Sequence, residues 1–170
     1  MSLRLRPYKP CDADSIISWI KDEKALRKWS SDRFGNFPIT SEDINNKYLA
    51  KNGDCTEADN FYPFTAFDES GPVGHLILRY TDEEKKTIRF GFVIIDDAKR
   101  GKGYGKQMLV LAIKYAFDIF GAEKVTLGVF DHNAPAYHCY KATGFQENGE
   151  ERFCALFGET WRIIEMEINR

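Results

Sequence analysis

Residues 90–106 read FGFVIIDDAKRGKGYGK, an apolar strand pattern that leads directly into a glycine-rich turn. The residues that follow, up to Phe120, carry apolar side chains at the spacing of an amphipathic helix, and Gly121 is well placed to end it. A turn at a helix start presents backbone N–H groups that have no intrahelical acceptor. The helix dipole adds partial positive charge at the same point. This order of strand, turn and helix therefore predicts an anion site that suits a phosphate or pyrophosphate group.

The residues of the turn favour the same ligand. Alternating glycines would let the backbone approach a ligand without Cβ clashes, and basic side chains would add positive charge. The glycines are Gly101, Gly103 and Gly105, and the basic residues are Arg100, Lys102 and Lys106. The turn is not a Walker A loop, because Gln107 stands where that loop needs a hydroxyl, and it lacks the third glycine and the acidic ribose ligand of a Rossmann fingerprint. A glycine-rich loop without a ligand is the alternative.

A second pattern lies at residues 133–145. Asn133 suits a helix N-cap, and Pro135 fits the first turn of that helix. Tyr140 follows seven residues after Asn133, which places both residues on one face of a helix, two turns apart. Each has an ordinary alternative, since Asn133 can be a plain cap and Tyr140 a core aromatic whose hydroxyl finds any convenient partner.

Together the two patterns resemble the GNAT superfamily of acetyl-CoA-dependent N-acetyltransferases. The turn is similar to the family's motif A, Arg/Gln-x-x-Gly-x-Gly/Ala. The second pattern is similar to the family's Asn-x-x-Ala-x-x-x-Tyr-x-x-x-Gly-Phe, with matches at Asn133, Ala136, Tyr140, Gly144 and Phe145. The resemblance runs over nearly the whole chain. It implies acetyl-CoA as the cosubstrate, with its pyrophosphate on the loop amides.

The chain in order predicts one α/β (α+β) domain over residues 1–170. Apolar alternation predicts strands, and helical spacing predicts three early helices, a central helix and a late one. The expected strands are 3–8, 61–67, 73–80, 87–95, 124–130, 145–156 and 160–168, and Asp12 or Asp14 is expected to cap the first helix. The resemblance implies a mixed, mostly antiparallel sheet of about seven strands, flanked by helices and splayed between strands four and five.

The resemblance also implies which residues bind the cosubstrate. The backbone of Val93, Ile94 and Ile95 would pair with the pantetheine arm between the splayed strands, and Asn133 and Tyr140 would contact the same arm. The loop residues that would surround the pyrophosphate are Arg100, Gly101, Lys102, Gly103, Tyr104, Gly105 and Lys106.

The implied reaction is direct attack of an amine on the thioester, through an oxyanion-bearing tetrahedral intermediate. An amide of the fourth strand, at Ile94 or Ile95, would donate to the oxyanion, and Ile95 is the residue we assign. The Tyr140 hydroxyl would face the thioester sulfur. Because its ordinary pKa is about 10, against about 8.5 for a thiol, it can stabilise or protonate the departing thiolate. Tyr140 and Ile95 are therefore the expected catalytic residues.

The general base and the acceptor site are less defined. Many family members carry a glutamate on strand four, but residues 88–93 contain no carboxylate. The candidates for a base are Asp131, His132, His75 and Glu83, and deprotonation through water is equally acceptable. The acceptor should enter over the early helices, so the expected lining residues are Trp29, Arg33, Phe34, Phe37 and Asp131. Trp29 and Phe34 are equally suited to the core.

Composition narrows the class of protein. A chain of 170 residues with 43% hydrophobic residues can bury a substantial core. A net charge of −2 argues against a general nucleic-acid binder. There is no apolar run of membrane-spanning length, and the four cysteines and three histidines show no spacing typical of a metal site or a disulfide framework. These features favour a cytoplasmic protein without a metal, a membrane or a nucleic acid as partner.

The sequence thus predicts an N-acetyltransferase that transfers an acetyl group to a primary amine. The acceptor would be a protein N-terminus, a polyamine or another small amine, and a homodimer is left open. Two alternatives are a non-catalytic module that binds CoA as a sensor and a protein that binds nucleotide phosphates.

Overall fold

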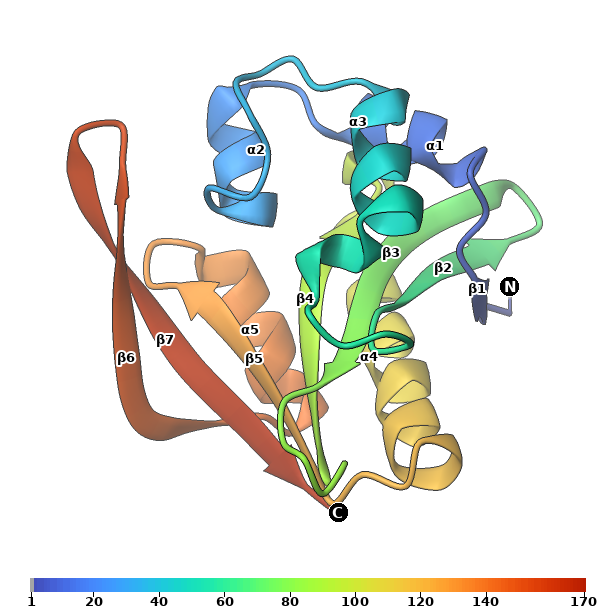
Figure 1. Ribbon diagram of the computed structural model, residues 1–170, viewed down its shortest axis with the longest axis vertical. Helices are drawn as coiled ribbons and strands as arrows, with labels where there is room; N and C mark the ends of the chain where they lie inside the picture. The colour runs from blue at the N-terminus through green and yellow to red at the C-terminus, as the bar shows by residue number, and fades with distance from the viewer. Residues whose placement is uncertain (1) are drawn as a thin grey trace.

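The computed structural model describes residues 2–170, and its centre is a seven-stranded sheet (Figure 1). The strand order is β1-β2-β3-β4-β5-β7-β6. All neighbouring strands run antiparallel except β4 and β5, which run parallel. The strands are β1 Arg4–Pro7, β2 Tyr62–Asp68, β3 Gly71–Tyr80, β4 Thr87–Ile95, β5 Lys124–Phe130, β6 Gln146–Leu156 and β7 Glu159–Asn169. The predicted fold class is confirmed.

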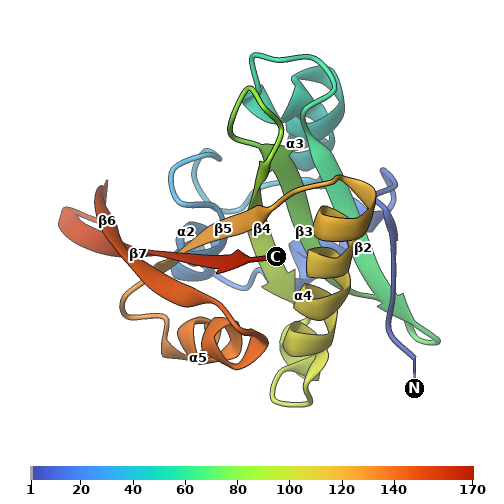
Figure 2. The same cartoon turned by 90° about the horizontal axis from the view of Figure 1, so that it is seen from below.

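Helices cover both faces of the sheet, and each face has its own core. One face carries α1 Asp12–Trp19, α2 Glu23–Ser30 and α3 Ser41–Asn45, whose buried residues cluster with Phe92 and Ile94 of β4. The other face carries α4 Tyr104–Lys114 and α5 Ala134–Thr143, which lie next to each other in Figure 2 and pack on Ile88 and Phe90. No helix within residues 2–170 has the length and apolar character needed to cross a bilayer.

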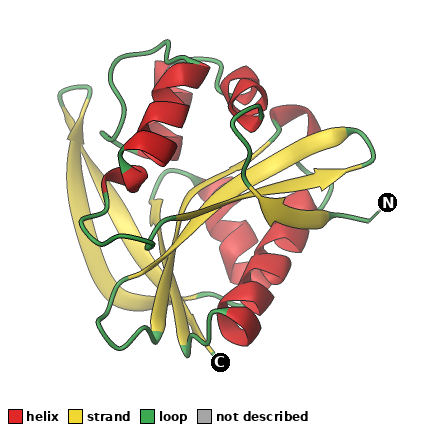
Figure 3. Ribbon diagram, turned by 45° about the vertical axis from the view of Figure 1, so that its right-hand side comes forward, coloured by secondary structure: helices red, strands yellow, loops and turns green. Residues whose placement is uncertain are grey.

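The long hairpin of β6 and β7 diverges from the rest of the sheet (Figure 3). Strand β6 pairs with β7 alone, and the register between them shifts between Glu147 and Glu151. The sequence indicated an interruption of this strand, and the shift is where it lies. Because β7 lies between β5 and β6 in the sheet, side chains of β7 lie close to those of β5 and β4.

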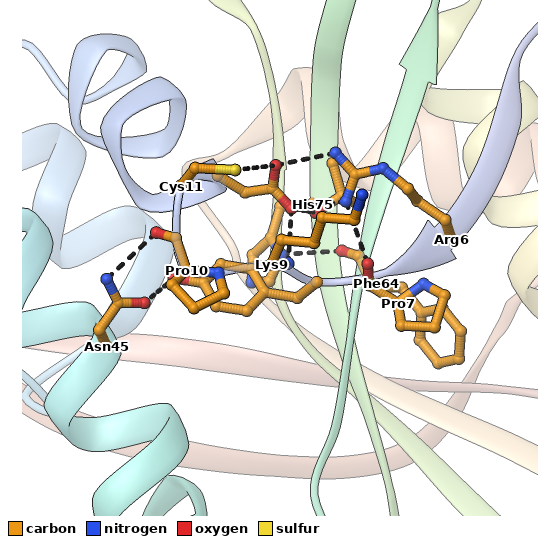
Figure 4. Close-up of polar contacts among 11 residues, drawn as sticks. Arg6, Pro7, Lys9, Pro10, Cys11, Asn45, Phe64 and His75 are labelled. Atoms are coloured by element: carbon orange, nitrogen blue, oxygen red, sulfur yellow. Dashed lines mark hydrogen bonds and ion pairs between the residues drawn. The ribbon is translucent and has the colours of Figure 1, made fainter.

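The first helix begins differently from the prediction. Cys11 is its N-cap residue and provides no side-chain cap, and the carboxylate of Asp12 turns to other partners. Arg6 donates to it through both terminal nitrogens at 2.8 and 2.9 Å, and the Lys9 N–H donates at 2.8 Å (Figure 4). The Thr65 hydroxyl donates at 2.7 Å. Burial opposes ionisation of Asp12, but these bonds hold its pKa below the ordinary value. Asp12 therefore ties β1 and β2 to α1 instead of capping it.

His75 is buried in the sheet with both ring nitrogens engaged. Its Nδ1 lies 2.8 Å from the Phe64 carbonyl oxygen (Figure 4), and its Nε2 lies 2.7 Å from the Tyr48 hydroxyl. The carbonyl can only accept, so Nδ1 carries the proton and Nε2 accepts from Tyr48. This ring is a structural link between β2, β3 and the π-helical segment Asn46–Ala50 that continues α3, and it has no lone pair to offer a substrate.

We expect His75 to make stability depend on pH. Burial lowers its pKa to about 4 from 6.5, so the unfolded chain binds a proton that the folded chain rejects. The stabilisation is complete above pH 6.5 and is lost as the pH falls toward 4, by about 3 kcal/mol in total. The free energy of unfolding should be measured across this range for the wild type and for His75→Gln, whose amide can replace both hydrogen bonds. Parallel curves for the two proteins would contradict the assignment.

Candidate functional site

Strands β4 and β5 separate after a short paired segment. Only Thr87, Ile88 and Arg89 of β4 pair with β5, opposite Lys124, Val125 and Thr126. Beyond that point β4 continues against β3, and β5 continues against β7. The two strands diverge toward the helices α2 and α5 in Figure 1. The splay implied by the family resemblance is therefore present, and it leaves the inner edges of both strands open.

A β-bulge shapes the open edge of β4. Phe92 has a φ of 49°, and the register against β3 shifts opposite it, between His75 and Ile77. A bulky residue in this region is strained by about 1–3 kcal/mol. The bulge breaks the alternation of the strand, because Phe90 packs on the α4–α5 face and Phe92 on the α1–α3 face. The Trp29 indole N–H holds the bulge by donating to the Phe92 carbonyl oxygen at 2.8 Å.

A cavity of about 340 Å³ occupies the splay. Its walls come from the open parts of β4 and β5, from α5 on one face, and from the end of α2 and strands β6 and β7 on the other. The predicted residues that line it are Trp29, Arg33, Val93, Asn133 and Tyr140. The cavity is thus reached by residues from both faces of the sheet, which a fully paired sheet would keep apart.

Tyr140 and Asn133 line the α5 side of the cavity with free polar groups. The Tyr140 hydroxyl forms no hydrogen bond with residues 2–170. Every side-chain oxygen among these residues that is fully buried has a hydrogen-bond partner, so this hydroxyl is not fully buried. The hydroxyl must therefore be open to the cavity. Burial of the ring raises the pKa of Tyr140 well above its ordinary value, so the group is a protonated donor at neutral pH. Asn133 sits at the N-cap of α5, as predicted, but its side chain makes no capping bond there.

The backbone of β4 also offers an N–H to the gap between β4 and β5, at Ile95, although Ile94 and Ile95 are not among the residues that line the cavity. The Asp96 N–H donates to the Val73 carbonyl oxygen at 2.8 Å, so it points toward β3. Successive peptide groups of a strand alternate in direction. The Ile95 N–H therefore points away from β3, toward the gap between β4 and β5, whereas the Ile94 N–H does not. This geometry separates the two amides that the sequence left open.

The glycine-rich loop forms the N-terminal end of α4, as expected. Gly101 and Gly103 have φ values of 76° and 83°, a region in which side chains with a Cβ are strained. Gly103 is the N-cap residue without a side-chain cap, and Arg100, Lys102 and Lys106 are exposed around it. The amides of the first turn point out of the helix without intrahelical acceptors. The loop thus has the form of an anion site.

Two residues of this loop, Gly105 and Tyr104, contribute to packing in the interior of the protein. Gly105 has an ordinary backbone conformation, and a Cβ there would lie 3.1 Å from the Cys139 sulfur on α5. Its small size therefore allows α4 and α5 to pack closely. The Tyr104 ring is buried, and its hydroxyl donates to the Asp68 carboxylate at 2.8 Å. Tyr104 can contribute only its backbone to the loop surface.

The predicted acceptor residues divide into three groups. Trp29 and Arg33 line the cavity, and Trp29 belongs to the core as well. Phe34 is buried behind Trp29, with ring centroids 5.5 Å apart and planes at 11°, so it supports the wall from inside. Phe37 and Asp131 lie outside this lining, and Asp131 instead lines a neighbouring hollow of about 550 Å³ near Trp161.

Sequence reasoning missed a set of charged residues beside the splay. Arg89 of β4 forms two bonds to the Glu165 carboxylate of β7, at 2.8 and 3.0 Å, and Arg152 of β6 adds a third at 2.8 Å. Burial opposes ionisation of Glu165, but both arginines keep its pKa below the ordinary value. Gly128 makes room, since a Cβ there would lie 3.0 Å from the Arg89 guanidinium. The available signal was Arg89, a charged residue inside the otherwise apolar run of residues 88–95.

Comparisons with known proteins find relatives of this sequence and this fold. Residues 2–146 match the sequence model of the family described as acetyltransferase (GNAT) domain. The spermine/spermidine N(1)-acetyltransferase of Bacillus subtilis is 32% identical over 106 residues, covering 59% of this chain and 69% of that protein. The provisionally named phosphinothricin acetyltransferase YwnH of B. subtilis is 29% identical over 153 residues, 88% of this chain and 86% of its own. The crystal structure of spermidine N-acetyltransferase from Vibrio cholerae with CoA and spermine superposes with a TM-score of 0.80 at 21% identity, over 98% of this chain and 95% of that one.

Proposed function

We propose that this chain, which belongs to the GNAT family and is an acetyl-CoA-dependent N-acetyltransferase, acetylates the primary amine of a small molecule by direct attack within a ternary complex. The observation that carries the proposal is the cavity in the splay, with walls from both faces of the sheet. A thioester held on the α4–α5 side and an amine that enters beside α2 can meet there. Polyamines fall within this class, and a protein N-terminus, the other acceptor that the sequence left open, would undergo the same chemistry. The catalytic assignment leaves no place for the non-catalytic sensor.

The loop and the open strand are suited to hold acetyl-CoA. The amides and cations around Gly101 and Gly103 fit its pyrophosphate, because N–H groups without intrahelical acceptors lie there beside positive charge. The open backbone edge at Val93 and Ile95 fits the pantetheine arm, whose amides can pair with a strand edge, whereas the backbone of Ile94 faces β3. The uncommitted Asn133 side chain can complete that contact.

Two groups of this chain act on the reacting atoms in our proposal. The Ile95 N–H donates to the thioester carbonyl oxygen as negative charge develops there. The amine attack forms the C–N bond first, and the Tyr140 hydroxyl donates to the sulfur when the tetrahedral intermediate collapses and the C–S bond breaks. Because burial raises the pKa of Tyr140 far above that of a thiol, full proton transfer is unfavourable, and the hydroxyl stabilises the thiolate as a hydrogen-bond donor. The proton lost by the amine leaves through water.

We expect the pH dependence of kcat/KM to follow the acceptor and not a protein base. Both nitrogens of His75 are engaged, and Glu165 is bound by two arginines, so neither can take a proton from the amine. Two acceptors whose amine pKa values differ should give profiles displaced by that difference. A shared inflection near pH 6 would contradict this and indicate a dedicated base.

The ternary complex is tested in the same assay. Initial rates of CoA release, measured while both substrates are varied, should give intersecting double-reciprocal lines. Parallel lines would indicate an acetyl-enzyme and would contradict direct attack.

A further inference from the structure

The acceptor side of the cavity is strongly basic. Its charged lining residues are the cations Lys28, Arg33, Arg89 and Arg152 and the single carboxylate of Asp32. The buried carboxylate of Glu165 lies next to this wall, where Arg89 and Arg152 share it. The reacting amine must therefore approach the thioester through a region with surplus positive charge.

Four arginines converge on this region, and we call Arg33, Arg79, Arg89 and Arg152 the arginine cluster. Arg79 and Arg89 stand directly opposite each other on β3 and β4, a like-charge pair that destabilises a sheet. The pKa values of Arg33 and Arg79 are lowered mainly by burial of their guanidinium groups, and further by the positive charge of the neighbouring arginines. The fold therefore holds these positive charges together against their mutual repulsion.

The cluster has little compensation from the protein itself. Glu165 pairs with Arg89 and Arg152, but Arg33 and Arg79 form no ion pair with any carboxylate in the described chain, residues 2–170. Arg33 instead lies over the ring of Phe92, with its guanidinium carbon 5.4 Å from the ring centroid. Arg33 thus leaves its hydrogen-bond donors for a ligand, and it lies beside the bulge that shapes the cavity.

The position of the cluster assigns it to the acceptor and not to the cosubstrate. Side chains alternate along β4, and Ile88 and Phe90 pack on the α4–α5 face. Arg89 therefore points to the opposite face, where α2 and the β6–β7 hairpin lie. The anion site of the glycine loop, at the start of α4, is a separate concentration of positive charge.

We propose that the acceptor is a small amine that carries an anionic group, a carboxylate or a phosphinate, and that Arg33 and Arg152 bind this group while the amine faces the thioester. Guanidinium groups are suited to such oxyanions because they donate two parallel hydrogen bonds. A cavity of about 340 Å³ has the size of a small-molecule site. A polyamine would bring several positive charges to the same wall and be repelled. The inference rests on the proposed function, whose acceptor class it narrows.

The test compares binding and turnover for matched amines. Phosphinothricin and L-glutamate serve as anionic probes, and n-butylamine and spermidine as probes without an anion. Their binding to the enzyme–CoA complex is measured by calorimetry, and their acetylation by CoA release from acetyl-CoA. We expect the wild type to bind an anionic probe at least about tenfold more tightly than spermidine, since charge-assisted hydrogen bonds are lost with the anion.

Variants identify the residues responsible. Arg33→Gln combined with Arg152→Gln should weaken binding of the anionic probe by about ten- to a hundredfold and leave acetyl-CoA affinity and melting temperature unchanged. Solvent reaches both side chains, although their surroundings partly desolvate the Arg33 guanidinium, and Glu165 keeps Arg89 as a partner. Arg162→Gln is the matched control, because Arg162 pairs with exposed Glu151 outside the cavity lining. It should bind all probes like the wild type.

Four results would overturn the inference. Two concern the probes: spermidine binds more tightly than both anionic probes, or neither anionic probe binds. The other two are preference for an acidic N-terminal peptide over both anionic probes, and weakened acetyl-CoA binding in the double variant. The last result would assign the cluster to the cosubstrate. Failure of the proposed function is distinguishable, because an anionic probe would then bind in an Arg33-dependent manner while no amine in the panel releases CoA.

Discussion

Replacement of Gly103 by Glu is expected to weaken acetyl-CoA binding by about 10²–10⁴-fold while the protein remains folded. The substitution places a Cβ and a negative charge at the N-terminal end of α4, where the phosphate oxygens would accept from backbone amides. Loss of two charge-assisted hydrogen bonds, at about 1.5–3 kcal/mol each, accounts for this range. Calorimetric titration with acetyl-CoA measures the change directly.

The structure predicts that the fold tolerates this change. The nearest atom to a Cβ at Gly103 is the Gln107 amide nitrogen at 3.8 Å, so only backbone strain from the φ of 83° is added. Gly149→Glu is the matched control, because Gly149 has a φ of 87°, lies in open space and sits on β6, away from the loop. It should cost similar stability and leave binding unchanged. Gly103→Gln separates the charge from the Cβ. Wild-type affinity in Gly103→Glu would remove the loop from the pyrophosphate site.

Local patterns were sufficient to predict most of the framework. Alternation and helical spacing depend on neighbours within a few residues, so strands β2 to β5 and the helices α2, α4 and α5 could be read from them. The capping box of α3, formed by Thr40 and Asp43, is a local feature of the same kind. The cap expected at Asp12 was wrong, because Arg6 and Thr65 compete for that carboxylate. A partner 53 residues away does not appear in a local pattern.

The charged side of the site could not be predicted for the same reason. Arg89 and Glu165 are 76 residues apart, and they meet only because β5 lies between β4 and β7 in the sheet. Without the strand order, Arg89 is an isolated charge in an apolar run, and Glu165 is one of several charged residues along β7. The bulge at Phe92 is equally invisible, because its residue type does not favour positive φ. The glycine loop and the Asn133–Tyr140 spacing were accessible because each lies within one contiguous segment.

Replacement of Tyr140 by Phe is expected to lower kcat by at least about tenfold and to leave the acetyl-CoA dissociation constant nearly unchanged. The hydroxyl meets the sulfur as a donor only when negative charge develops there, so its loss affects the transition state more than the bound ground state. A hydrogen bond to a charged group contributes about 1.5–3 kcal/mol, which corresponds to about ten- to 150-fold in rate.

The structure also removes the main ambiguity of this experiment. The Tyr140 hydroxyl has no hydrogen-bond partner among residues 2–170, so Tyr140→Phe keeps the buried ring and breaks no internal bond. Its melting temperature should therefore match the wild type. Tyr137→Phe on the same helix is the matched control, because the Tyr137 hydroxyl donates to Glu147 at 2.7 Å on the exposed surface. That variant should retain full turnover. Normal kcat in Tyr140→Phe would exclude the hydroxyl from the reaction, and a lowered melting temperature with normal turnover would make Tyr140 a core residue alone.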